Sequence, residues 1–248
     1  MKHLLIVGRP GVGKTTLVKR LTQELCGCPI DGFFTEELRE GEERLGFWLS
    51  SLDGRQALLA HRRMASPYRV GSYKVNVAVL DDLAVGIIRR AMRRALILFL
   101  DEIGKMELLS RPFQKAVEEA VVRGPRIVAT GGIHRLPFLD TLKRRKDVEL
   151  VPLSEGNRKA VFEELRARLQ ALCDEDEHVQ ALQRQADRIC EMIVSGDVPE
   201  IDIEIQQAKL RDAVNQLFPE KQALYHLLYE SRFRRLWQQF HQWKLRTD

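Results

Sequence analysis

The chain of 248 residues has little cysteine, with only Cys26, Cys28, Cys173 and Cys190. Their spacing forms no pair of zinc-ligand motifs, and their number is too low for a small disulfide-rich secreted fold. The pair Cys26 and Cys28 lies one residue closer together than the cysteines of the usual redox motif. We therefore expect reduced thiols that serve ordinary packing.

Long apolar runs are lacking as well. A membrane-spanning helix needs about 18 consecutive apolar residues, whereas the apolar run at residues 96–100 stops at Asp101 and Glu102. The apolar segment at residues 4–7 is too short for a secretory signal. We expect a protein without a membrane span that stays in the cytoplasm.

Acidic residues are scarce in the first two thirds of the chain and in excess in the last third. Residues 1–170 carry 30 basic and 21 acidic side chains, a net charge of +9, whereas residues 171–248 carry 10 and 14, a net charge of −4. Two differently charged parts are indicated, which agrees with one to two domains at about 150 residues each. A basic surface attracts any polyanion, so the positive charge of the first part alone is weak support for nucleic acid binding.

Short apolar runs alternate with segments of helical periodicity as far as about residue 172. The runs predict strands at residues 3–7, 30–36, 45–49, 56–60, 96–100, 126–129 and 148–151. The periodic segments predict helices at residues 15–25, 81–94, 112–122, 137–144 and 154–172. The polar turn around Gly41 indicates a hairpin or two neighbouring strands. The alternation as a whole predicts an α/β fold, a parallel sheet flanked by helices.

The last third of the chain predicts a small all-α domain. The acidic run at residues 174–177 is typical of a solvated linker or a helix start, so we place the boundary between domains 1–172 and 173–248. Three helices are expected beyond it, at residues 178–195, 202–217 and from Pro219 onward. The last helix carries an aromatic stripe of Phe233, Trp237, Phe240 and Trp243. Such a stripe serves as core packing or docks a protein partner, a membrane surface or nucleic acid, and packing is favoured because a unit of this size needs the buried area.

The residues after the first strand fit the phosphate-loop pattern G-x-x-x-x-G-K-[ST]. They are Gly8, Arg9, Pro10, Gly11, Val12, Gly13, Lys14 and Thr15, followed by Thr16. Backbone N–H groups of such a glycine-rich loop turn inward around phosphates at the positive end of a helix. Lys14 is expected to reach the β- and γ-phosphates, Thr15 to ligate Mg²⁺, and Thr16 to contact the α-phosphate.

A phosphate loop needs an acidic group that holds the metal ion, and Asp101 follows the apolar run at residues 96–100. Ligands gather at the carboxyl ends of parallel strands, so Asp101 is predicted to hold the Mg²⁺ shell. Glu102 follows directly and is predicted to polarise the attacking water. The alternative for this acidic pair is a helix cap.

The order and spacing of several motifs resemble the THEP-type, or cancer-related, nucleoside-triphosphatase family over residues 1 to about 170. The matching motifs are GRPGVGKTTL at residues 8–17, GFFTEE at 32–37, GF at 46–47, RVGSYKVNV at 69–77 and DEIGKMEL at 101–108. The resemblance implies Mg²⁺-dependent hydrolysis of nucleoside triphosphates to diphosphate and phosphate on a RecA-like or related Rossmann-like sheet. Two departures are Lys159, where an acidic residue is expected, and the residues from about 171 onward, which the short family members lack.

Four further positions are candidates for contact with the nucleotide. Asn157 and Arg158 follow a strand near the binding edge and could contact base or ribose, or could serve as helix cap and surface charge. Arg69 could act as an internal arginine finger, with Arg62 and Arg63 as alternatives, or could be a solvated side chain. Thr130 closes the strand at residues 126–129 and could sense the γ-phosphate or bond the backbone.

These predictions converge on a Mg²⁺-dependent nucleoside-triphosphatase whose substrates are ATP, GTP and other nucleoside triphosphates, with Lys14, Glu102 and Arg69 as catalytic residues. One alternative is a nucleotide-gated switch or adaptor whose helical tail binds a protein or, less favoured, nucleic acid. Another is a nucleotide or small-molecule kinase. The basic run at residues 143–146 could bind RNA or a second nucleotide, but solvation at a helix end is favoured.

Overall fold

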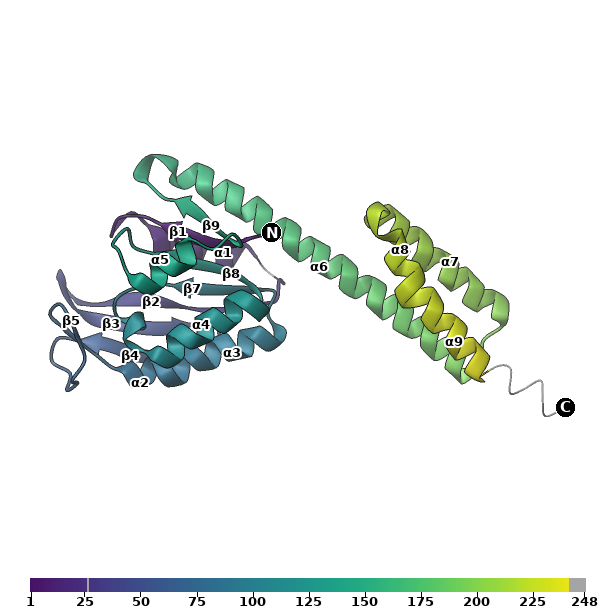
Figure 1. The fold of residues 1–248 in the computed structure, drawn as a ribbon, viewed down its shortest axis with the longest axis horizontal. Helices are drawn as coiled ribbons and strands as arrows, with labels where there is room; N and C mark the ends of the chain where they lie inside the picture. The colour runs from purple at the N-terminus through teal and green to yellow at the C-terminus, as the bar shows by residue number, and fades with distance from the viewer. Residues whose placement is uncertain (26, 241–248) are drawn as a thin grey trace. The chain divides into compact units, whose positions relative to one another are not determined.

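A computed structural model describes residues 1–25 and 27–240, and the chain divides into two compact units, Met1–Cys173 and Asp174–Asp248 (Figure 1). The first unit is built on one nine-stranded sheet with the order β5-β6-β4-β3-β2-β7-β8-β1-β9. Its strands are β1 (His3–Val7), β2 (Ile30–Glu40), β3 (Glu43–Ser51), β4 (Gln56–His61), β5 (Arg69–Val70), β6 (Tyr73–Val75), β7 (Ile97–Asp101), β8 (Arg126–Gly131) and β9 (Val148–Pro152).

Five neighbouring strands, β2, β7, β8, β1 and β9, run parallel to one another. They are connected by helices, and the helical segments of this unit are α1 (Lys14–Glu24), α2 (Val77–Val79), the π-helical turn η1 (Leu80–Ala84), α3 (Val85–Arg94), the 3₁₀ turn η2 (Glu107–Leu109), α4 (Arg111–Arg123), α5 (Pro137–Lys143) and the 3₁₀ turn η3 (Glu155–Asn157). Only β8 separates β1 from β7. The carboxyl ends of β1 and β7 therefore lie close together at one edge.

The other half of the sheet is antiparallel and contains the hairpin expected around Gly41. Strand β2 turns back into β3 through Gly41 and Glu42, and Gly41 has a φ of +57°. A two-residue turn of this kind favours residues that tolerate positive φ. Strands β4, β6 and β5 continue the antiparallel pairing. The short β5–β6 hairpin was not predicted, because its strands are only two and three residues long.

Alternate residues of β7 belong to two separate cores. Leu98 and Leu100 pack with α3, α4 and α5, whereas Ile97 and Phe99 pack with α1 and the first part of α6 (Arg158–Ser195). All four side chains are buried. Both faces of the strand are covered, which explains why its sequence is continuously apolar.

A disulfide joins Cys28 to Cys173, so the prediction of reduced thiols is wrong for these two cysteines. Cys28 follows α1, Cys173 lies on α6, and both belong to the core on the same face of the sheet. Their separation of 145 residues left no spacing pattern in the sequence. Cys190 is a buried free thiol in the second unit, and Cys26 lies outside the described residues.

The acidic run at residues 174–177 lies inside helix α6, which corrects the interpretation of this run as a linker or a helix start. Residues 158–195 contain neither glycine nor proline, so nothing in the sequence ends the helix there. Gly196, with a φ of +68°, follows the end of α6. The remaining helical segments are α7 (Glu200–Leu217), the 3₁₀ turn η4 (Pro219–Lys221), α8 (Gln222–Tyr225), the π-helical turn η5 (His226–Glu230) and α9 (Ser231–Phe240).

The second unit has its own apolar core, in which the aromatic stripe takes part. Phe233 and Tyr225 are buried, and Trp237 packs partly buried against them, whereas Phe240 is 38% exposed. Trp243 lies outside the described residues. Core packing is therefore the role of the inner part of the stripe. Among the described residues, no helix has the length and apolar character that crossing a bilayer requires.

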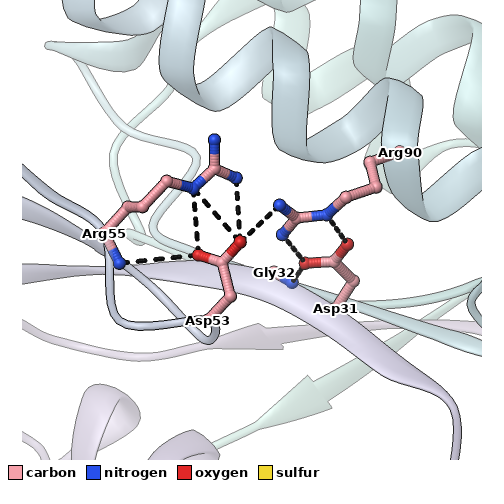
Figure 2. A network of polar contacts seen from close by, with 5 residues as sticks. All are labelled: Asp31, Gly32, Asp53, Arg55 and Arg90. Carbon is pink, nitrogen blue, oxygen red and sulfur yellow. Dashed lines mark hydrogen bonds and ion pairs between the residues drawn. The ribbon is translucent and has the colours of Figure 1, made fainter.

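At the end of the sheet opposite the glycine loop, Arg90 of α3 binds two aspartates (Figure 2). Its Nε and Nη2 atoms donate to the two carboxylate oxygens of Asp31 at 2.6 Å each, and the Gly32 N–H donates to Asp31 at 2.8 Å. Arg90 also bonds Asp53, which Arg55 contacts in turn. The contacts with Arg55 and Arg90 lower the pKa of Asp53, and the hydrogen bonds to Asp31 raise the pKa of Arg90.

Candidate active site

The glycine loop connects β1 to α1, where three of its glycines meet different requirements. A Cβ at Gly8 would lie 2.8 Å from the Leu153 carbonyl oxygen and from Val12 Cγ1, so only glycine fits. Gly11 and Gly13 have φ values of +76° and +92°, which favour glycine. The sequence therefore dictates a loop whose backbone lies open to a ligand, with Arg9, Pro10, Gly11 and Thr16 exposed.

Lys14 is the first residue of α1 and is only 7% exposed. Its Nζ lies 3.4 Å from the carbonyl oxygens of Gly8 and Arg9 and 3.8 Å from Oε2 of Glu102. The structure thus brings the loop lysine and the acidic residue after β7 together. The Lys14 ammonium group therefore lies between the backbone of the loop and the Glu102 carboxylate.

Asp101 is fully buried at the end of β7, and the peptide bond to Glu102 is cis. Its Oδ1 accepts a hydrogen bond from the Thr130 hydroxyl at 2.5 Å, while its Oδ2 is buried without a hydrogen-bond partner among the described residues. Burial raises the pKa of Asp101 to about 6, and the hydroxyls of Thr130 and Thr15 oppose that shift. Thr130 therefore bonds the carboxylate, a role that the sequence interpretation had not considered.

A second buried acid, Glu107, lies near the same place and was not assigned a role from the sequence. It is 3% exposed, and its Oε2 accepts a hydrogen bond from the Gly104 N–H at 3.0 Å. The Thr35 hydroxyl donates to its Oε1 at 3.4 Å. Burial raises the pKa of Glu107 to about 8, with a smaller contribution from the charge of Glu102. Its only signal in the sequence was its place in the motif at residues 101–108.

Arg158 lies against the glycine loop, and Asn157 shapes the turn before it. The Arg158 Nε is 3.6 Å from the point that a Cβ of Gly13 would occupy. The Asn157 amide accepts a bond from the Ser154 N–H at 2.8 Å and donates to the Pro152 carbonyl at 2.9 Å. Asn157 thus acts as a helix-capping residue, which was the alternative to nucleotide contact.

The structure does not bring Arg69 to this group. Arg69 lies exposed on β5, seven strands from β1 in the sheet order, and its Nε donates to the Gly71 carbonyl at 2.7 Å. Arg62 pairs with Glu43, and Arg63 is exposed. In the basic run, Lys143 and Arg145 have acidic neighbours, Asp140 at 3.7 Å and Asp147 at 2.6 Å. These ion pairs agree with the interpretation of residues 143–146 as a solvated surface segment.

A glycine loop between a strand and a helix, with a buried aspartate two strands away, defines the class of phosphate-loop nucleotide-binding proteins. Comparison with known proteins gives the family: the family model described as NTPase matches residues 3–166. The chain belongs to this nucleoside-triphosphatase family, a family of hydrolases. The resemblance, fold class and enzyme class predicted from the sequence are thereby confirmed.

Individual relatives agree with this assignment. The nucleoside-triphosphatase THEP1 of Thermotoga maritima is 44% identical over 162 residues, which cover 65% of this chain and 92% of the relative. The cancer-related nucleoside-triphosphatase homolog of Bos taurus is 34% identical over 186 residues, covering 68% and 97%. The crystal structure of THEP1 from Aquifex aeolicus matches with a TM-score of 0.60 at 35% identity, covering 66% and 96%. The family model ends within α6, so the second unit lies outside its match.

Proposed function

We propose that the first unit hydrolyses ATP, GTP and other nucleoside triphosphates to diphosphate and phosphate with Mg²⁺. The observation that carries this proposal is the convergence of Lys14, Asp101 and Glu102 at the glycine loop. The Lys14 Nζ lies 3.8 Å from Glu102 Oε2. The hydroxyl of Thr15, the residue next to Lys14, lowers the pKa of the Asp101 carboxyl group. A cation, a buried carboxylate and a more exposed one are the groups that phosphoryl transfer to water needs.

The loop supplies the phosphate contacts. The backbone N–H groups of Gly11 and Gly13 and the amino end of α1 favour negative charge, because the helix dipole is positive there. Lys14 exchanges its two carbonyl contacts for the stronger attraction of phosphate oxygens. Thr16 is exposed beside it and is suited to the α-phosphate.

Thr15 and Asp101 are the residues that fit a magnesium ion. Asp101 Oδ2 is buried without a hydrogen-bond partner among the described residues, and the raised pKa of Asp101 indicates a carboxyl group short of positive charge. Hydroxyl and carboxylate oxygens are the ligands that Mg²⁺ prefers. The ion supplies neutralisation of charge on the β- and γ-phosphate oxygens when it is bound.

Glu102 is suited to position and polarise the attacking water. Its side chain is 37% exposed, so water reaches the carboxylate, and the Lys14 contact keeps it at the loop. A carboxylate beside the γ-phosphate orients water for in-line attack and receives its proton as the new bond to phosphorus forms; the bond from phosphorus to the bridging oxygen breaks, and the diphosphate leaves with its electron pair. Arg158, against Gly13, is proposed to contact base or ribose, with Asn157 holding its turn.

Phosphate release tests this function. The full chain is assayed with ATP, GTP, CTP and UTP, with and without Mg²⁺, beside Glu102→Gln. We expect release in the presence of Mg²⁺, and in Glu102→Gln a loss of kcat with nucleotide affinity retained. Phosphate that appears only on an added acceptor would contradict hydrolysis and support a kinase.

A nucleotide-gated adaptor is the second candidate, and one observation favours it. The second unit exposes apolar side chains, with Leu227 at 68%, Ile201 at 60% and Leu228 at 57%. Leu227 and Leu228 are adjacent in the chain, and neighbouring exposed apolar side chains are a feature of surfaces that bind other proteins. Tight Mg²⁺-nucleotide binding with negligible phosphate release would favour the adaptor over the hydrolase.

A further inference from the structure

The segment after Asp101 is fixed by a chain of backbone hydrogen bonds that ends on Glu107. The Ile103 N–H donates to the Thr130 carbonyl at 2.8 Å, and the next N–H, that of Gly104, donates to Glu107 Oε2 at 3.0 Å. The Leu108 N–H then donates to the Gly104 carbonyl at 3.1 Å. Two consecutive amides directly after Glu102 are therefore held, one by β8 and one by the Glu107 side chain.

Gly104 also separates the two glutamate carboxylates. A Cβ at Gly104 would lie 3.0 Å from Glu102 Oε1 and 3.0 Å from Glu107 Oε2. The Glu102 and Glu107 oxygens therefore lie on either side of the position that a side chain at residue 104 would fill. Glycine leaves this position empty. Within the described part of the chain, the ion pair of Glu102 is the 3.8 Å approach to Lys14, so the place of Glu102 depends largely on the backbone that carries it.

We propose that Glu107 is a positioning residue for Glu102: its buried carboxyl group fixes the Gly104 amide and so holds the Glu102 carboxylate at the mouth of the glycine loop. This inference rests on the proposed function, in which Glu102 orients water. Thr35 of β2 holds Glu107 from the other side, so the support comes from a neighbouring strand of the sheet.

Stability alone gives a poor account of Glu107. Burying a carboxyl group costs free energy, and an apolar side chain of similar volume is often neutral or stabilising at such a site. A supporting group that fixes a catalytic side chain has a different signature. Misplacement of a reacting group by about 1 Å lowers the rate of reaction by about 10²-fold while the substrate still binds.

The test compares three variants in the full chain. Glu107→Met keeps the volume without carboxyl oxygens, Glu107→Gln keeps an acceptor for the Gly104 N–H, and Gly104→Ala places a methyl group against both carboxylates. Steady-state kcat and KM for Mg²⁺-ATP, binding of a fluorescent ATP analogue and thermal unfolding are measured. Asp31→Asn is the matched control, because it alters a buried acid at the opposite end of the sheet.

Glu107→Met and Gly104→Ala are expected to lower kcat by about 10- to 100-fold, with KM and analogue affinity within about threefold of the unmodified chain. Glu107→Gln should restore kcat to within about fivefold. Asp31→Asn should lower the unfolding temperature without this loss of kcat. Recovery of kcat in Glu107→Gln but not in Glu107→Met would show that Glu107 positions the backbone through its acceptor oxygen and does not merely fill space.

Unchanged kcat in a folded Glu107→Met chain would overturn the positioning role, and so would a loss in Glu107→Gln as large as in Glu107→Met. Equal losses of kcat in Glu107→Met and Asp31→Asn, in proportion to unfolding temperature, would reduce Glu107 to a structural residue. If Glu102→Gln loses kcat while Glu107→Met does not, only this inference fails. If the unmodified chain releases no phosphate, the proposed function fails with it.

Discussion

Two buried aspartates on neighbouring strands of one sheet are held in opposite ways. Asp31, near the start of β2, receives two bonds from Arg90 and one from the Gly32 N–H, so both of its oxygens have donors (Figure 2). Asp101, at the end of β7, has the Thr130 hydroxyl on Oδ1 and no hydrogen-bond partner for Oδ2 among the described residues.

The difference supports the proposal that the ligand binds at the end of the sheet next to the glycine loop. At the end of the sheet where Arg90 lies, Asp31 and Asp53 are each paired with an arginine, and the arginine contacts lower the pKa of Asp53. At the loop end burial raises the pKa of Asp101 to about 6 and that of Glu107 to about 8. A buried carboxyl group that lacks a cation costs stability, and the loop end keeps two of them where a metal ion and phosphate are proposed to bind.

The largest expected effect concerns Lys14, the buried cation at the glycine loop. Lys14→Ala should lower kcat/KM for nucleoside triphosphate hydrolysis by at least about 10²-fold, because the charge that meets the phosphates is removed. Phosphate release and isothermal titration with Mg²⁺-ATP measure it. Activity near that of the unmodified chain would contradict the proposal that the nucleotide site lies at the glycine loop.

A paired substitution sharpens the comparison of the two aspartates. Asp101→Asn should lower hydrolysis by about 10²-fold while the free energy of unfolding stays equal or rises, because the amide needs no counter-charge. Chemical denaturation and phosphate release are measured on the same samples.

Asp31→Asn should do the reverse. It should keep kcat within about twofold and lower the free energy of unfolding by about 2 kcal/mol, because the partly buried Arg90 loses a carboxylate. Similar profiles for the two variants would show that the two ends do not differ in function.

The raised pKa of Glu107 predicts a pH dependence of stability with a defined sign. Burial raises the pKa of its carboxyl group from the ordinary 4.5 to about 8, so between these pH values the folded chain keeps a proton that the unfolded chain has lost. The free energy of unfolding therefore falls as pH rises through this window, by roughly 2–5 kcal/mol from this group.

Glu107→Gln removes this contribution. Denaturant unfolding of both chains at about pH 5, 6.5 and 8 should show a smaller decline for the variant. Parallel pH curves for the two chains would mean that the Glu107 carboxyl group does not hold its proton in the folded state.

The smallest expected effects are those of substitutions at Arg158 and Arg69. Arg158→Ala should weaken nucleotide affinity by about 3- to 10-fold, because Arg158 lies against Gly13. Arg69→Ala should change kcat less than about threefold, because Arg69 lies on β5 at the far edge of the sheet. A kcat loss of about 10²-fold or more in Arg69→Ala, with affinity kept, would restore the arginine-finger hypothesis.

Most of the first unit could be predicted from local patterns. Continuous apolar runs marked the parallel strands, helical periodicity marked the helices between them, and the loop motif between residues 8 and 15 indicated the site. In the antiparallel half, the hairpin around Gly41 and the strand at residues 56–60 were predicted, whereas β5 and β6 were not, because strands as short as these leave little periodicity.

The sequence by itself determined the glycine loop, the acidic residues that end β7 and the helical second unit, because each depends on contacts within a few residues. Only the tertiary structure decided that Cys28 meets Cys173, that Glu107 holds the Gly104 amide and that Arg69 lies far from Lys14. These outcomes depend on which distant elements become neighbours and on how deeply a side chain is buried. Strand order and burial are properties of the whole packed sheet, so no short segment of sequence carries them.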